Sequence, residues 1–192
     1  MDNKNSLTHI FIDFSNIYIG FINYTENKYK ILNAKINCEK LLKIIEKDNN
    51  VEKRVLIGSE KANIKYKNYE KHIQKIFMKY GYIVTILKRY KKEYGVDELL
   101  HEKIEETLNS ELPGTIIIGS GDGKVANDNN SFYNLTINAL YKGWNVVIIS
   151  WKYQLSRNYS NGEELYELLK DEEVKKRFTQ ISLEKYIDEL IL

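Results

Sequence analysis

The chain contains very little cysteine and proline, and it has no long apolar run. Cys38 is the single cysteine, which excludes an intramolecular disulfide and any cysteine-rich zinc cluster. Pro113 is the single proline, and no Gly/Ser-rich or charged tract is long enough to divide the 192 residues. We therefore expect one domain over residues 1–192, in which Cys38 has a structural role near the start of a helix.

Targeting and membrane signals are absent as well. No apolar stretch approaches the roughly 20 residues that cross a bilayer, and the N-terminus lacks the pattern of a signal peptide. The expectation is a soluble, intracellular protein of the cytoplasm.

A strong charge of one sign is also missing. The 29 basic residues nearly balance the 27 acidic ones, which gives a net charge of +2. Nucleic-acid binders are recognised by a strong or clustered positive excess, so this balance does not by itself indicate one. Evidence for such a partner has to come from local patches.

Five short apolar runs, dominated by isoleucine and valine, alternate with segments of helical periodicity. Their hydrophobicity is continuous, which is typical of strands buried on both faces of a parallel sheet. The alternation predicts a three-layer α/β/α fold with a central, mainly parallel five-stranded sheet. The predicted strands are His9–Phe14, Arg54–Ile57, Tyr82–Leu87, Thr115–Ile118 and Val146–Ser150.

Capping residues mark the predicted helices. Asn37 and Ser131 precede apolar helical patterns, and Gly81 and Gly143 follow such patterns. The predicted helices follow Asn37, cover Tyr66–Tyr80 and Val96–Leu108, run from Ser131 through Leu140, and close the chain over Leu183–Leu192.

Three aspartates lie just past predicted strands. Asp13 ends the first strand, Asp97 begins the helix after the third, and Asp122 follows the fourth in "IIIGSGDG". Ligands of open α/β sheets bind beyond the carboxyl ends of the strands, so we expect these carboxylates at one edge of the sheet. Such a cluster needs a cation, and Mg²⁺ or Mn²⁺ prefers oxygen ligands. The pattern indicates a metal site that activates water against a phosphodiester bond.

Each aspartate taken alone also has a simpler explanation. Asp97 is at a position where aspartate caps a helix, and Asp13 is at a strand end where aspartate forms turns. His101 shares a helix face with Asp97, but a histidine there is more often structural than a ligand. The metal hypothesis depends on the three aspartates together.

The loop "GSGDGKVANDNNSF" has other interpretations, and none fits well. A phosphate-binding loop needs a serine or threonine after its lysine, but Lys124 is followed by Val125. The dinucleotide pattern GxGxxG fails at Lys124 as well. Calcium binding through Asp122, Asp128 and Asn130 lacks the spacing and the closing glutamate of a calcium loop.

Four motifs together resemble the NYN domain family, a branch of the PIN-like nuclease superfamily. They are "FIDFSNIYIG", "KKEYGVDELLHEKI", "PGTIIIGSGDG" and "INALYKGWNVVIISWKYQLS", in the family's order over residues 8–160. The resemblance implies a PIN-like fold over this core, with residues 161–192 as a C-terminal helical extension. It also implies an acidic cluster that binds Mg²⁺ or Mn²⁺ and a ribonuclease activity on single-stranded or structured RNA.

The resemblance assigns roles to particular residues. Asp13, Asp97 and Asp122 match the aspartates of the first strand, the "GVD" element and the "SGD" element, and they would be catalytic metal ligands. Asn16 matches the asparagine that holds the first turn or the substrate, and Ser120 matches a small hydroxyl residue that shapes the site.

One position departs from the family's pattern. Many PIN-like enzymes have a further acid two residues beyond the last aspartate, where this chain has Lys124. Asp128 would be the substitute metal ligand if the loop folds back. The departure leaves an alternative function open, in which a catalytically weak or inactive PIN-like domain binds RNA or a protein partner.

Basic and aromatic residues gather before Asp97 and after the fifth predicted strand. Lysine and arginine neutralise phosphates and aromatic rings stack on unpaired bases, so Lys92, Lys152 and Arg157 are the candidates for contacts to the RNA backbone. Solvated surface remains the alternative for the lysines of Lys61–Lys79. PIN-like domains often pair, so a homodimer is a further expectation.

Overall fold

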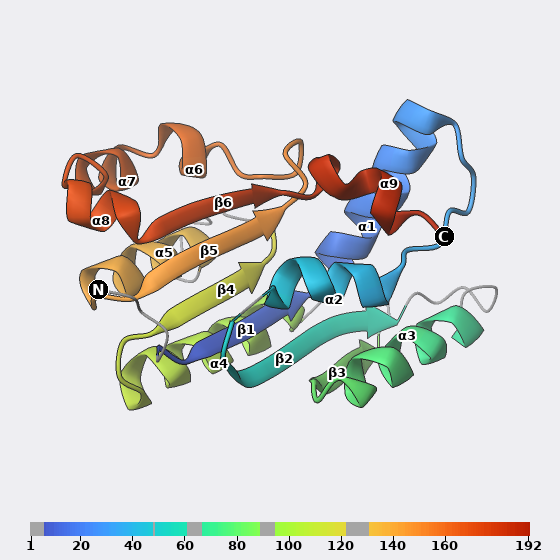
Figure 1. Cartoon of the computed structure of the whole chain (residues 1–192), viewed down its shortest axis with the longest axis horizontal. Coiled ribbons are helices and arrows are strands. Elements are labelled where there is room, and N and C mark those ends of the chain that lie inside the picture. Colours follow the sequence, from blue (N-terminus) through green and yellow to red (C-terminus); the bar gives the residue numbers. More distant parts are fainter. Residues whose placement is uncertain (1–5, 48, 61–66, 89–94, 122–130) are drawn as a thin grey trace.

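The computed structural model describes residues 6–47, 49–60, 67–88, 95–121 and 131–192. At its centre is one sheet of six parallel strands in the order β3-β2-β1-β4-β5-β6 (Figure 1). The predicted parallel α/β architecture is confirmed, with one strand more than the five expected. The strands are β1 Thr8–Asp13, β2 Val51–Glu60, β3 Ile83–Lys88, β4 Thr115–Gly119, β5 Asn145–Ser150 and β6 Phe178–Ser182.

The central strands are apolar on both faces, and each face has its own core. Ile10 and Ile12 of β1 belong to one core and Phe11 to the other, and all three are 0% exposed. Successive side chains of a strand point to opposite faces, so a run of isoleucine and phenylalanine needs a helical layer on each side. The result is a three-layer α/β/α fold.

One layer packs on the core that contains Ile10, and the other on the core that contains Phe11. The first layer consists of α1 Phe14–Tyr24 with a π turn at Thr25–Tyr29, α2 Cys38–Glu46, α3 Lys67–Lys79, a 3₁₀ turn at Leu183–Tyr186 and α9 Ile187–Leu190 (Figure 1). The second consists of α4 Val96–Ser110, α5 Phe132–Tyr141, α6 Asn158–Asn161, α7 Glu163–Leu168 and α8 Glu172–Lys176.

Four predicted helix boundaries are confirmed, at Asn37, Ser131, Gly81 and Gly143. The side chains of Asn37 and Ser131 each accept a hydrogen bond, at 3.1 Å, from the backbone N–H three residues further on. Gly81 and Gly143 follow α3 and α5 with φ of 82° and 87°, a left-handed conformation that glycine adopts without strain. Cys38 is the first residue of α2 and is buried, and burial raises the pKa of its thiol to about 12. The thiol therefore stays protonated and has the expected structural role.

The C-terminal segment differs from the helical extension expected for residues 161–192. Phe178–Ser182 forms β6 and pairs with β5, and the helix expected over Leu183–Leu192 is reduced to the 3₁₀ turn and the short α9. In β6, "FTQIS", polar residues interrupt the apolar ones, because an edge strand has one neighbour and is only partly buried. The continuous apolar run that marks the central strands is therefore missing from its sequence.

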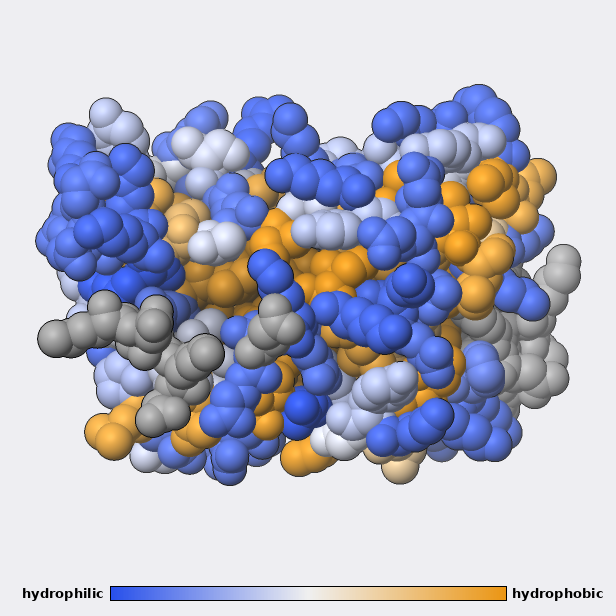
Figure 2. Space-filling model, in the orientation of Figure 1, coloured by the Kyte–Doolittle hydropathy of each residue, from blue (hydrophilic) through white to orange (hydrophobic). Residues whose placement is uncertain are grey.

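The surface is mixed on the face that α2 and α9 cover. Figure 2 shows polar residues over most of this face and apolar residues at the surface in its middle. No helix within the described ranges is both long enough and apolar enough to cross a membrane.

Candidate functional site at the carboxyl ends of β1 and β4

The strand order places a topological switch point at the middle of the sheet. β1 and β4 are neighbours, but α1 follows β1 onto one face and α5 follows β4 onto the other. In open α/β sheets, ligands bind beyond the carboxyl ends of the strands at this point. The loops that leave β1 and β4 are therefore the first place to search for function.

Asp13 is at this point, at the end of β1. It is 5% exposed, and its Oδ1 accepts a hydrogen bond of 3.0 Å from the backbone N–H of Asn16. Asp13 is thus also the N-cap of α1, where the helix dipole stabilises a negative charge. The simpler explanation of Asp13 was a turn at a strand end, and the structure gives it a different local role, as the cap of a helix.

Asn16 joins the loops after β1 and β4. Its Oδ1 accepts a hydrogen bond of 3.1 Å from the backbone N–H of Gly121, a residue 105 positions away in the sequence. The carbonyl oxygen of Gly121 accepts a further bond of 2.9 Å from the backbone N–H of Ser156, after β5. Gly121 is therefore held from two sides, and the three exit loops form one connected edge.

The close contacts at Gly121 explain why this residue is a glycine. A Cβ there would overlap the Ser150 hydroxyl and would lie 2.9 Å from the carbonyl oxygen of Gln154. Ser120, the preceding residue, is 1% exposed. The structure thus places Ser120, with its side chain buried, next to the residue that Asn16 contacts.

Asp97 is in the first turn of α4, which packs against β1 and β2. The N-cap position of this helix is Gly95, with φ of 90°, so Asp97 is not the capping residue. The carboxylate is exposed, and its place one residue inside the helix is favoured by the helix dipole. Asp97 therefore lies at the start of α4, as expected, but it is not the N-cap that its sequence position suggested, because Gly95 occupies that position.

His101 is four residues after Asp97 in α4, but it faces the interior whereas Asp97 is exposed. It is buried, and its Nδ1 lies 3.7 Å from Oε2 of Glu105. Burial lowers the pKa of His101 and the nearby Glu105 carboxylate partly opposes this effect. The imidazole is neutral at neutral pH and packs inside the fold, which agrees with the structural role that its position suggested.

Several predicted residues lie outside the described residues. They are the metal-ligand candidates Asp122 and Asp128, the departure at Lys124, and the substrate-contact candidate Lys92. Within the described ranges, no group of three or more His, Cys, Asp or Glu residues could hold a metal ion. That part of the chain contains two of the three predicted catalytic aspartates, Asp13 and Asp97, together with the oxygen donors of Asn16 and Ser120. Oxygen donors of this kind suit Mg²⁺ or Mn²⁺ rather than a soft metal.

The residues after β5 divide into packing and surface residues. Trp151 is 0% exposed, and its indole N–H donates a 2.8 Å hydrogen bond to the carbonyl oxygen of Ile17, so its ring has no face for a base. Lys152 and Arg157 are exposed and lie in the segment that leaves the carboxyl end of β5. They remain candidates for contacts to phosphates.

Sequence reasoning missed two features of this edge. One is the link between Asn16, Gly121 and Ser156, which joins residues far apart in the sequence. The other is the pair Ser15 and Ser59, in which Ser15 Oγ accepts a 2.9 Å hydrogen bond from the Ser59 backbone N–H. The signal in the sequence is weak. Ser15 and Ser59 each come one or two residues after a predicted strand, His9–Phe14 and Arg54–Ile57.

No protein-family model, curated protein or solved structure matches this chain. The functional assignment therefore rests on the geometry of the switch point and on the sequence motifs that surround it.

Proposed function

We propose that this protein is a metal-dependent ribonuclease of the NYN type, which cleaves RNA phosphodiester bonds at the carboxyl ends of β1 and β4. The observation that carries the proposal is the hydrogen bond between Asn16 Oδ1 and the Gly121 N–H. It fixes the exit of β4 against the turn that contains Asp13, and the next residue in the sequence after Gly121 is Asp122. Asp13 and Asp122 are thus close in the sequence to the two residues that this hydrogen bond joins.

The charge at the start of α1 argues against a dinucleotide site. The order β3-β2-β1-β4-β5-β6 also occurs in dinucleotide-binding sheets, in which a glycine-rich β1–α1 turn holds a pyrophosphate at the helix N-terminus. Here that turn is Asp13-Phe14-Ser15, without glycine, and the Asp13 carboxylate itself occupies the helix N-terminus. A buried carboxylate repels a phosphate and attracts a cation, so a metal site is favoured over a dinucleotide site.

In the proposed mechanism, Asp13, Asp97 and Asp122 would hold Mg²⁺ or Mn²⁺, which would supply a hydroxide at neutral pH and stabilise the charge of an in-line displacement. Asn16 acts as a positioning residue, because it keeps the loops after β1 and β4 in register. Lys152 and Arg157 would neutralise phosphates of the bound strand from the segment after β5.

The proposal is tested with labelled single-stranded RNA in the presence of Mn²⁺, Mg²⁺ or a chelator. Wild-type protein is expected to cleave with either metal and not with the chelator, and Asp13→Asn and Asp97→Asn are expected to abolish cleavage. The matched control is Asp171→Asn, because Asp171 is the N-cap of α8 and accepts a 2.8 Å bond from the Glu173 N–H. Equal cleavage by wild type and both site variants would refute the site, and RNA binding without cleavage under any metal would favour the non-cutting module.

A further inference from the structure

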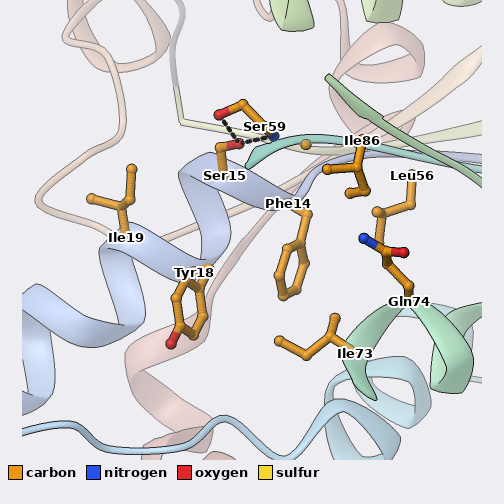
Figure 3. A pocket seen from close by; sticks show the side chains of 10 residues that line it. Phe14, Ser15, Tyr18, Ile19, Leu56, Ser59, Ile73, Gln74 and Ile86 are labelled. Carbon is orange, nitrogen blue, oxygen red and sulfur yellow. Dashed lines mark hydrogen bonds between the residues drawn. The ribbon is translucent and has the colours of Figure 1, made fainter. Parts of the chain in front are cut away.

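Two hollows in the structure differ in the room that they offer a ligand. The space between α1 and α3, beside the Ser15–Ser59 pair, has a volume of about 40 Å³ (Figure 3). Its walls include core side chains such as Phe14, Leu56 and Ile73, so it holds at most a few water molecules. A second pocket, at the carboxyl ends of β5 and β6, has a volume of about 290 Å³. This volume is close to the lower end of the range of about 300–1,000 Å³ for sites of small ligands.

The pocket at β5 and β6 has polar walls. Ser150 and Ser182 are partners in the register of these two strands and are the last residue of each, so their side chains lie next to each other at this edge of the sheet. Lys152 follows β5, and Lys185 belongs to the 3₁₀ turn that follows β6. Both lysines are exposed and line the pocket, together with Ser160 of α6.

The charges around the pocket favour an anion. Within the part of the chain that the structure describes, neither Lys152 nor Lys185 forms an ion pair. One carboxylate is close, that of Glu184, which accepts hydrogen bonds from the Lys152 backbone N–H, at 2.6 Å, and from the Ser182 hydroxyl. The pocket thus has two ammonium groups without a carboxylate partner and one carboxylate that already accepts two hydrogen bonds, so its net charge is positive.

The pocket is beside the proposed metal site. β5 is the neighbour of β4 in the sheet, and a Cβ on Gly121 would overlap the hydroxyl of Ser150 at the end of β5. Neighbouring strands are about 4.8 Å apart, so β6 lies about 10 Å from β4. An RNA strand that passes Gly121 along this edge therefore reaches the pocket within a short stretch of its backbone.

We propose that this pocket binds one phosphate group of the RNA strand, and this inference rests on the proposed function because it names a substrate contact of the same site. The charged oxygens of a phosphate accept hydrogen bonds, and lysine is a common donor to them. Lys152 and Lys185 would each donate to the phosphate from a different strand end, and Ser160 would add a hydroxyl donor.

The test measures binding of short single-stranded RNAs in a chelator, so that no cleavage occurs. Each RNA has one phosphate replaced by an uncharged methylphosphonate, and this position is moved along the strand, terminal phosphates included. Wild-type protein should show one position at which the replacement weakens binding about tenfold, the size expected for a hydrogen bond to a charged group. The double variant Lys152→Gln/Lys185→Gln should lose this sensitivity, and the slope of its log K against log salt concentration should be smaller by about 0.7.

The matched control is Lys175→Gln/Lys176→Gln, which removes the same charge from α8, where both lysines pair with glutamates of their own helix. This control should keep the sensitive position. Lys152→Arg/Lys185→Arg retains both charges in the pocket and should keep the sensitive position too. Thermal unfolding checks that each variant is folded.

The outcomes separate this proposal from the function on which it rests. One sensitive position that only Lys152→Gln/Lys185→Gln abolishes supports the pocket even if no RNA is cleaved with Mn²⁺. A flat profile in the wild type, or a sensitive position that this variant leaves unchanged, overturns the pocket even if cleavage depends on Asp13. Equal loss in the α8 control overturns it too, because net charge would then be the cause, as does the absence of any binding of RNA and of nucleoside monophosphates. Monophosphates that compete at the affinity of the whole strand, in the wild type alone, would support the phosphate site and identify a free nucleotide as its ligand.

Discussion

Polar side chains have different kinds of partner at the two ends of the sheet. At the amino end, polar side chains of strands pair with side chains of helices. Arg54 of β2 forms an ion pair of 3.0 Å with Glu46 at the end of α2, and Lys53 Nζ donates a 3.0 Å hydrogen bond to Thr107 Oγ1 of α4. His9 of β1 packs edge-on against Trp144, with ring centroids 5.6 Å apart.

At the carboxyl end, small polar side chains hold the backbone of neighbouring loops instead. Asp13 and Ser15 accept hydrogen bonds from backbone N–H groups, and Asn16 does so across the switch point to Gly121. Hydrogen bonds of this kind fix the positions of loops, whereas ion pairs between strands and helices join the layers. We therefore expect substitutions at the amino end to change stability alone, and substitutions at the carboxyl end to change function, with or without a loss of stability.

The largest expected effect is at Asp13. Asp13→Asn should reduce RNA cleavage by about 100-fold or more, because loss of one electrostatic group at a reacting centre typically costs this much. The free energy of unfolding should change by less than about 0.5 kcal/mol, because asparagine caps helices as well as aspartate does. Urea unfolding beside the cleavage assay checks both halves. A folded variant that cleaves RNA as fast as the wild type would show that Asp13 is only a helix cap.

A smaller effect is expected at Gly121. Gly121→Ala should lower the free energy of unfolding by about 1–3 kcal/mol, because its Cβ would overlap the Ser150 hydroxyl and force the exit loop to move. Cleavage should fall as well, since the loop that leads to Asp122 is displaced. Gly119→Ala, two residues earlier, is the control, because its Cβ would lie 3.4 Å from Ile12 Cγ1 in ordinary contact. Equal stability of the two alanine variants would contradict the tight edge.

At the amino end, Arg54→Met should reduce stability and leave cleavage unchanged. The two side chains of the Arg54–Glu46 pair are 25% and 21% exposed, and a partly solvated pair of this kind contributes up to about 1 kcal/mol. The comparison is Lys175→Met, because Lys175 and Glu172 are 59% and 71% exposed and their pair should contribute almost nothing. Chemical unfolding measures the difference in unfolding free energy between the two variants. A loss of cleavage in Arg54→Met would contradict the separation of stability at the amino end from function at the carboxyl end.

The smallest effect is a dependence of stability on pH. Burial lowers the pKa of His9. The nearby Glu111 carboxylate partly opposes this shift, the Lys53 ammonium reinforces it, and Glu52 opposes it to a smaller extent. The unfolded chain therefore binds more protons below a pH of about 6.5, and the stability that the neutral imidazole allows is lost as the pH falls through that range. His9→Phe keeps a ring against Trp144 and should flatten the fall in unfolding free energy between pH 7 and pH 5. An unchanged pH dependence in this variant would exclude His9 as its source.

Much of the fold could be predicted because its signals are local. Continuous runs of isoleucine and valine predict buried parallel strands, and Asn37 and Ser131 cap the helices that follow them. β6 was missed because an edge strand with partly exposed threonine and glutamine has no continuous apolar run. Its place in the sheet depends on pairing with β5, which no pattern within its own five residues shows.

The candidate site was less predictable, because its decisive contacts join distant residues. The expectation that Asp13 lies at the carboxyl end of the first strand needed only the order of elements. The hydrogen bond from Gly121 to Asn16, in contrast, spans 105 residues and depends on the order of β1 and β4 in the sheet.

The most direct test of the central claim is a crystal of the protein soaked in Mn²⁺, measured for the anomalous signal of manganese. We expect an ion at the carboxyl ends of β1 and β4, with oxygens of Asp13, Asp97 and Asp122 within about 2.0–2.5 Å, the range of carboxylate bonds to such ions. The same soak of Asp13→Asn should give a much weaker signal or none. A wild-type crystal with no manganese at this edge, or with manganese bound only elsewhere, would contradict the account.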